Sequence, residues 1–120
     1  MRAVALAFVL VTVAGCGSPA ETAADAADRV TKAVLADDVD AVSSSFATPL
    51  QGSITRAEVG SLSDTMTALG AYKGVTYESS DPSKHEYVYR ADFDRGSMGV
   101  VVRIDGSGKL DAYRVFPQRS

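Results

Sequence analysis

The sequence predicts an α+β domain in which N-terminal helices pack on an antiparallel sheet of about four strands. Two periodicities support this fold class. Between residues 23 and 69, apolar residues recur every three or four positions, which is the spacing of one face of an α-helix. Between residues 72 and 116 they alternate with polar residues, and turn-forming residues separate the alternating segments. Helices that precede such a sheet are expected to bury their apolar faces against one side of it.

The composition is that of one ordinary globular domain. The chain has 120 residues, of which 46% are hydrophobic and 22% are charged. Its formal net charge is -3 and its lysines and arginines form no cluster, so a nucleic-acid partner is not expected. One cysteine and one histidine are too few for a disulfide framework or for a multi-ligand zinc site. We therefore expect no metal and no other cofactor.

The start of the chain has the features of a secretory signal peptide. Arg2 supplies a positive charge, and Ala3–Val13 is an uncharged apolar run of eleven residues. A helix of this length is too short to cross about 30 Å of hydrocarbon. The run ends in the segment Val13-Ala14-Gly15-Cys16, which resembles a bacterial lipobox. In a lipobox the chain is cleaved before the cysteine, and a diacylglycerol group is attached to the cysteine sulfur.

The lipobox resemblance implies a membrane anchor at Cys16, because two acyl chains hold a protein stably in a bilayer. The expected organisation is a signal peptide over residues 1–15, a lipidated cysteine and short tether over 16–22, and one α+β domain over 23–118. The expected location is the extracytoplasmic face of the bacterial cell envelope, with the membrane as a partner. The alternative is an ordinary signal peptide in which Cys16 is incidental.

The helical half is expected to begin with one long and one short helix. The long helix is predicted over residues 23–36, with Ala27, Val30 and Val34 on its apolar stripe. Asp37 or Asp38 interrupts this stripe and is a candidate N-cap for the short helix, which covers residues 39–46.

The last helix is predicted to begin after Thr55 and to end near residue 69. Thr55 and Glu58 match a capping box, in which the threonine hydroxyl accepts from the N3 amide and the glutamate reaches back to the N-cap. The apolar face of this helix is expected to pack on the sheet. Five residues are predicted to be almost fully buried in that core: Leu62, Met66, Tyr89, Val100 and Val102.

The alternating half is predicted to form a four-stranded meander over residues 72–79, 85–94, 97–105 and 109–116. A tight turn at Arg95-Gly96 places Phe93 opposite Met98, and the pairs continue in steps of two to Tyr87 opposite Ile104. The Gly106-Ser107-Gly108 loop is expected to be a hairpin turn. It places Ile104 opposite Leu110, Val100 opposite Arg114 and Arg103 opposite Asp111.

These registers predict an apolar inner face and a partly apolar outer face. Tyr87 and Tyr89 point to the inner face, where they line a pocket or pack in the core. On the outer face an apolar patch surrounds Gly99 and has a charged rim, which is the arrangement of an interface. The members of this candidate interface are Val88, Val101, Tyr113 and Val115. Its alternatives are coverage by the N-terminal segment and ordinary scattered exposure.

Arg114 does not fit the inner face on which the predicted register places it, because burying an unpaired guanidinium is very costly. Three interpretations remain open. A β-bulge turns it out to solvent, an internal carboxylate or an exposed edge accommodates it, or it lies in a pocket for an anionic or polar ligand. Under the third interpretation, the candidate pocket consists of Tyr87, Tyr89 and Arg114.

The order of elements, with a short second helix at Asp38–Val42 and a last hairpin at Arg103–Leu110, resembles the nuclear-transport-factor-two-like superfamily. The resemblance implies a cystatin-like cone, in which a curved sheet wraps around helices. It extends to small bacterial domains of unknown function in secreted lipoproteins. Enzymes of the superfamily place acidic, histidine or tyrosine residues inside the cone. Here His85 is expected at a solvated strand end, Asp92 and Asp94 are expected on the outer face, and no catalytic residue is assigned.

The expected function is that of a non-catalytic, lipid-anchored domain that binds a small ligand or a protein partner. The resemblance also implies pairing through the outer face, so the expected partner is a second copy or another envelope protein. Two alternatives remain open. One is a cone-fold enzyme of the isomerase or cyclase type, and the other is a structural subunit of an envelope assembly.

Overall fold

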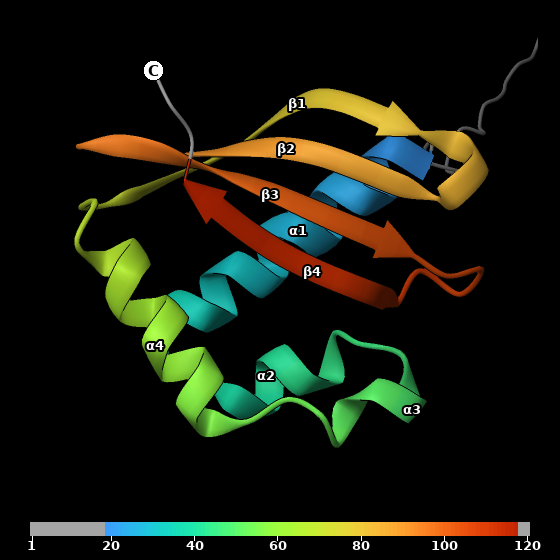
Figure 1. The fold of residues 1–120 in the computed structure, drawn as a ribbon, viewed down its shortest axis with the longest axis horizontal. Helices are drawn as coiled ribbons and strands as arrows, with labels where there is room; N and C mark the ends of the chain where they lie inside the picture. Colours follow the sequence, from blue (N-terminus) through green and yellow to red (C-terminus); the bar gives the residue numbers. More distant parts are fainter. Residues whose placement is uncertain (1–18, 118–120) are drawn as a thin grey trace, which may run out of the picture.

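The structure is a computed structural model that describes residues 19–117 (Figure 1). The predicted signal peptide and the predicted lipidation site at Cys16 lie outside the described residues. The elements follow in the order α1 (Pro19–Leu35), α2 (Val39–Ser44), α3 (Thr48–Gln51), α4 (Arg56–Thr67), β1 (Tyr72–Asp81), the 3-10 turn η2 (Pro82–Lys84), β2 (Glu86–Phe93), β3 (Gly96–Ile104) and β4 (Leu110–Pro117).

The predicted α+β fold class is confirmed. The strands form an antiparallel meander in the order β1-β2-β3-β4, and the helices pack against one face of this curved sheet. Figure 1 shows α1 crossing the sheet, while α2, α3 and α4 lie below β4. One face of the sheet is therefore inner and helix-covered, and the described residues place no helix on the other, outer face.

The helix boundaries follow from local capping. α1 begins at Pro19, so residues 19–22 belong to its first turn and not to the predicted tether. Proline suits a first turn because its ring fixes a helical φ and its missing N–H would have no partner there. Asp38 caps α2 and accepts from the Ala41 amide at 3.1 Å, as predicted. Thr55 caps α4 and accepts from the Glu58 amide at 3.2 Å, while its hydroxyl donates to the Glu58 carboxylate at 3.0 Å.

The core joins the apolar stripe of α1 to the inner face of the sheet. Of the five residues predicted to be buried, four are: Met66, Tyr89, Val100 and Val102. Leu62 is only half-buried, so that prediction is wrong. The reason is its position at the edge of α4, where it lines a cavity between the helices and β4 instead of lying under the sheet.

The β2–β3 hairpin keeps the predicted faces but not the predicted pairs. Its turn is Asp94-Arg95, so Phe93 pairs with Gly96 and Tyr89 pairs with Val100. The turn is held by the segment just after α4, because the Arg95 amide donates to the Leu69 carbonyl at 2.8 Å. The observed register differs from the predicted one by two residues. Side chains alternate with a period of two, so the same residues still face the core.

The β3–β4 hairpin contains a bulge that reverses the predicted faces of β4. Ile104 pairs with Leu110 as predicted, but Arg103 then pairs with Ala112, which leaves Asp111 unpaired in the ladder. Leu110 is held by the segment after α2, since its amide donates to the Ser45 carbonyl at 3.0 Å. A bulge adds one residue to a strand, so every later side chain changes face.

Two predicted positions on β4 are therefore wrong, and one interpretation is confirmed. Tyr113 and Val115, which were expected on the outer face, are half-buried against the inner core. Arg114 points outward and is exposed, as the β-bulge interpretation required. The predicted pairing of Arg103 with Asp111 is lost, because Arg103 lies opposite Ala112 on one side and opposite Glu86 on the other.

Candidate functional site

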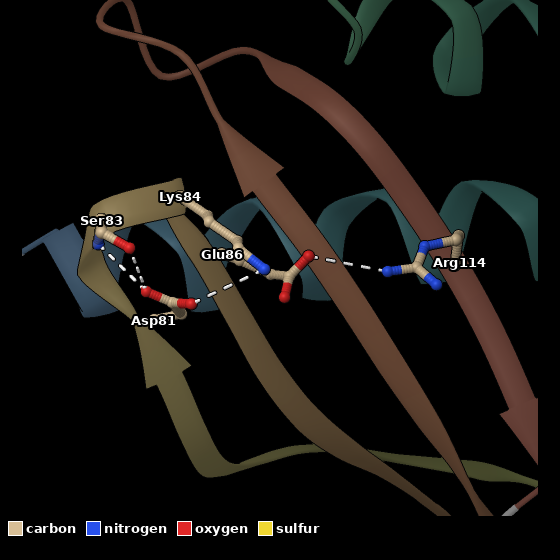
Figure 2. Close-up of polar contacts among 5 residues, drawn as sticks. All are labelled: Asp81, Ser83, Lys84, Glu86 and Arg114. Atoms are coloured by element: carbon tan, nitrogen blue, oxygen red, sulfur yellow. Dashed lines mark hydrogen bonds and ion pairs between the residues drawn. The ribbon is translucent and has the colours of Figure 1, made fainter.

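The three residues of the predicted pocket lie in three different environments. Tyr89 is 1% exposed and packs in the core, where its ring makes an edge contact with Tyr77 at 6.0 Å between centroids. Arg114 lies on the outer face, and its guanidinium is 3.6 Å from the Glu86 carboxylate (Figure 2). Tyr87 lies on the inner face, close to the end of the sheet where β2 begins. The structure does not bring these side chains into one pocket.

The ion pair of Arg114 belongs to a set of surface charges at the start of β2. Figure 2 shows Glu86 between Arg114 and the pair formed by Asp81 and Lys84, whose charged groups are 4.0 Å apart. Asp81 also accepts from the Ser83 hydroxyl at 2.6 Å and the Ser83 amide at 3.2 Å, and these bonds hold its pKa below its usual range. Exposed ion pairs of this kind contribute little to stability. We treat this set as ordinary surface charge and not as a binding site.

A cavity of about 280 Å³ lies directly inside this end of the sheet. It forms where the first turn of α1, the start of β2 and the loop between β3 and β4 meet. The side chains that line it come from all three segments: Thr22, His85, Tyr87, Ile104 and Asp105, with Gly106 and Gly108 of the loop. We call it the Tyr87 cavity. Two of its walls are the first residues of α1 and of β2, and the third is a hairpin loop. No single segment of the sequence therefore predicts the cavity.

The backbone around the Tyr87 cavity is set by two tight turns. His85 ends η2 in the left-handed conformation, with φ of 53°, which histidine tolerates better than most residues do. Asp105 organises the opposite loop, because its Oδ1 atom accepts from the Ser107 amide at 2.9 Å, the Ser107 hydroxyl at 2.8 Å and the Lys109 amide at 2.9 Å. The bond from the Ser107 hydroxyl, followed by the backbone bonds, lowers the pKa of Asp105.

The Tyr87 cavity is lined by a buried tyrosine whose hydroxyl has no partner among the described residues. Tyr87 is 8% exposed, and within residues 19–117 no hydrogen bond is formed by its hydroxyl group. Over the same residues no bond reaches Oδ2 of Asp105. The cavity thus offers a phenol that donates or accepts, a carboxylate that accepts and the imidazole of His85. These groups suit a small ligand that carries hydroxyl or amine groups.

A second cavity, of about 170 Å³, lies between α1, α2, α4 and β4. We call it the Tyr113 cavity. Its walls are mostly apolar and include Val34, Phe46 and Leu62. Here the tyrosine hydroxyl has a partner, since the Tyr113 and Thr31 hydroxyl oxygens are 2.9 Å apart. Burial raises the pKa of Tyr113 to about 12, against the smaller opposite effect of that bond, so its hydroxyl stays protonated.

Another hydroxyl joins α1 to β1. Tyr72 donates to the Asp28 carboxylate at 2.7 Å, and the ammonium group of Lys32 lies 2.9 Å from the same carboxylate. Burial, followed by this bond to a carboxylate, raises the pKa of Tyr72. Burial alone would raise the pKa of Asp28 as well, but the bonds from Tyr72 and Lys32 outweigh it and lower that pKa.

Sequence reasoning missed both hydroxyl contacts of α1. One signal was present, because Thr31 is a polar residue next to Val30 on the apolar stripe of α1. Its partner could not be found, since Tyr113 reaches the inner face only through the bulge at Asp111.

No protein-family model matches the chain, and neither a curated protein nor a solved structure is significantly similar to it. In the part of the chain that the structure describes, no helix is long and apolar enough to span a membrane. Among those residues, no three side chains of histidine, cysteine, aspartate or glutamate come together as a possible metal site.

Proposed function

We propose that this chain is a lipid-anchored domain of the bacterial cell envelope that binds a small ligand in the Tyr87 cavity. The ligand class is a small molecule with amine and hydroxyl groups. The anchor is the diacylglycerol group implied by the lipobox at Cys16. The observation that carries the binding proposal is the side chain of Tyr87, which is buried and lines the cavity, while its hydroxyl has no hydrogen-bond partner among the described residues.

The energetics of hydrogen bonding support this proposal. The Tyr87 hydroxyl has no protein partner among the described residues, and a ligand that supplies one gains a net hydrogen bond of about 0.5–1.5 kcal/mol. A protonated amine would be attracted by Asp105, whose lowered pKa keeps it ionised at neutral pH. An anionic ligand would instead be repelled by this carboxylate. The charge of the cavity therefore favours a neutral or cationic ligand.

The pKa shifts of Asp105 in the cavity and of Tyr89 beside it do not suit these two groups to acid–base catalysis. A general acid or base works best when its pKa lies near the working pH. The pKa of Asp105 is lowered, and burial raises the pKa of nearby Tyr89 to about 12, with Tyr87 and Tyr77 adding to the effect. Both groups are thus moved away from neutrality and stay in one protonation state. The alternative of a cone-fold enzyme gains no support from these two groups.

An NMR titration tests the ligand class. Amide spectra of the domain would be recorded with ethanolamine, which carries one amine and one hydroxyl, and with inorganic phosphate as the anionic counterpart. We expect ethanolamine to shift the amides of His85, Gly106 and Gly108, and we expect phosphate to leave them in place. The proposal fails if ethanolamine shifts none of the cavity amides, or if phosphate shifts them equally.

The anchor has its own test. Cells would be labelled with a palmitate analogue, and the wild type would be compared with Cys16→Ser. We expect label on the wild type alone and release of the variant from the membrane fraction. Equal membrane association of the two proteins would contradict lipidation at Cys16, and it would leave the Tyr87 cavity unaffected.

A second candidate function is self-association through the outer face of the sheet. Phe116 is 39% exposed there, and its ring lies so close over Gly99 that a larger residue at this position would have to displace the ring. Val88 and Val101 pair beside it, although Val101 is itself buried, so the accessible part of the patch is Val88 and Phe116. Tyr113 and Val115 no longer belong to it. Sedimentation equilibrium of the wild type and of Val88→Arg tests this candidate. A wild type that is monomeric at every concentration would exclude it.

A further inference from the structure

We propose that the end of the domain formed by η2 and the β3–β4 loop lies against the membrane surface and brings the Tyr87 cavity to the level of the lipid headgroups. This inference rests on the proposed anchor at Cys16. It adds an orientation, and it names the lipid bilayer as the surface that this end of the domain contacts.

The first argument is the length of chain between the anchor and the fold. α1 begins at Pro19, so only Gly17 and Ser18 separate it from Cys16. Consecutive Cα atoms are about 3.8 Å apart, so these three steps span at most about 11 Å in any conformation. The chain therefore keeps Pro19, the first residue of α1, within about 11 Å of the anchoring cysteine.

The second argument is what surrounds the first turn of α1. Thr22 lies in this turn and lines the Tyr87 cavity together with His85 and the glycines of the β3–β4 loop. Its methyl group would lie 3.8 Å from a Cβ atom added at Gly108. Figure 1 shows the start of α1, η2 and the β3–β4 loop together at one end of the domain. The β2–β3 turn at Asp94-Arg95 lies at the other end.

Electrostatic attraction is not the cause of this orientation, because the basic side chains at this end are matched in number by carboxylates. The basic ones are Lys84, Arg103, Lys109 and Arg114, and the acidic ones are Asp81, Glu86, Asp105 and Asp111. Lys84 pairs with Asp81 at 4.0 Å, and the Lys109 ammonium donates to the Ser44 carbonyl at 2.8 Å. The loop also contains the ionised carboxylate of Asp105. The attraction of such a balanced surface to anionic lipids is small. The short tether must then determine which end faces the bilayer.

The orientation restricts the ligands that reach the Tyr87 cavity. The eight residues of β2 span roughly 26 Å, so the β2–β3 turn lies up to about that much farther from the bilayer than the cavity does. Ligands present at the headgroup layer therefore meet the cavity first. A partner that approaches from farther out meets the β2–β3 turn and the end of α4 instead.

Paramagnetic NMR on anchored protein tests the orientation without relying on cellular lipidation. Residues 16–120, which include every described residue, would be labelled with ¹⁵N and coupled through the Cys16 thiol to a maleimide lipid in nanodiscs. A small fraction of gadolinium-chelating lipid would broaden amides near the surface. We expect loss of signal at Ser83, Lys84 and Ser107, and full signal at Gly70 and Arg95. Equal broadening at both ends, or stronger broadening at Arg95, would overturn the proposal.

A matched variant isolates the role of the tether. An insert of about twelve glycine and serine residues between Ser18 and Pro19 adds a flexible span of roughly 19 Å. We expect the difference between the two ends to disappear in this variant. A difference that persists at full size would also overturn the proposal, because the tether would then not set the orientation. Failure of the cellular Cys16→Ser test would leave this measurement unchanged, so the two claims are separable.

Discussion

The Tyr87 cavity and the Tyr113 cavity differ in what their tyrosine hydroxyl does. Both tyrosines lie on the inner face of the sheet and line a cavity. The Tyr113 hydroxyl lies 2.9 Å from that of Thr31, so it is part of the packing of α1 on β4. The Tyr87 hydroxyl has no such partner within residues 19–117. The comparison shows that a polar group in a cavity is a candidate for ligand binding only when it has no hydrogen-bond partner within the protein.

The position of α1 explains the difference. Its middle turns cross the inner face beside β4, so Thr31 reaches Tyr113. Its first turn reaches the end of the sheet near Tyr87, and the side chain that it contributes to that cavity is Thr22. The wall there is completed by loop backbone at Gly106 and Gly108, which provides no side chain to meet the phenol.

The largest expected effect concerns the packing of the Tyr113 cavity. Phe46 is buried and lines this cavity, so Phe46→Ala enlarges an existing space and removes apolar contacts. Phenylalanine to alanine changes in cores cost about 3–5 kcal/mol. We expect a loss of this size in the free energy of unfolding, measured by urea denaturation. Ile104→Val at the Tyr87 cavity removes one methyl group and should cost only about 0.5–1.5 kcal/mol. A loss in Phe46→Ala no larger than that of Ile104→Val would contradict the packing role given to Phe46.

The next largest effect concerns the Tyr113 hydroxyl itself. Thr31→Val keeps the shape of the side chain but leaves the Tyr113 hydroxyl buried without its partner. We expect a loss of about 1–3 kcal/mol in unfolding free energy. Thr31→Val combined with Tyr113→Phe removes both polar groups and should recover part of this loss. A double variant that is less stable than Thr31→Val would contradict the role given to this bond.

A smaller, pH-dependent effect is expected at Asp28, which accepts a hydrogen bond from a second satisfied tyrosine hydroxyl, that of Tyr72. The folded-state pKa of Asp28 is lowered from its ordinary value of 3.8, so its contribution to stability is present above that value. The contribution is lost as the pH falls through the lowered folded-state pKa. The stability difference between the wild type and Asp28→Asn, measured by urea denaturation from pH 7 to pH 2, should therefore shrink below about pH 4. If the stability difference between the two proteins grew as the pH fell, the pKa of Asp28 would not be lowered by folding.

The smallest expected effect is that of Tyr87→Phe. Removing a hydroxyl that has no protein partner loses no bond, so the unfolding free energy should change by less than about 0.5 kcal/mol. Thermal and urea unfolding of the variant measure this directly. A loss of 1 kcal/mol or more would show that the hydroxyl has a structural partner, and the contrast with Tyr113 would disappear.

The fold was predictable because it depends on periodicity, whereas the site depends on details that periodicity does not record. The faces of β2 and β3 were correct even though the turn lay elsewhere, since a shift of two residues preserves them. The faces of β4 were wrong because a single unpaired residue, Asp111, reverses them. An arginine on a predicted apolar face, Arg114, was the signal of that bulge. The Tyr87 cavity gave no comparable signal, because it forms only where three chain segments meet.

The most direct test of the binding proposal compares the ethanolamine affinity of three proteins by NMR titration: the wild type, Tyr87→Phe and Tyr113→Phe. Both variants lose one tyrosine hydroxyl from a cavity on the inner face, so they form a matched pair. A net hydrogen bond of about 0.5–1.5 kcal/mol corresponds to a roughly two- to tenfold change in Kd. We predict that Tyr87→Phe weakens ethanolamine binding by this factor and that Tyr113→Phe leaves it unchanged. Equal affinity in the wild type and Tyr87→Phe, or a larger loss in Tyr113→Phe, would contradict the proposal.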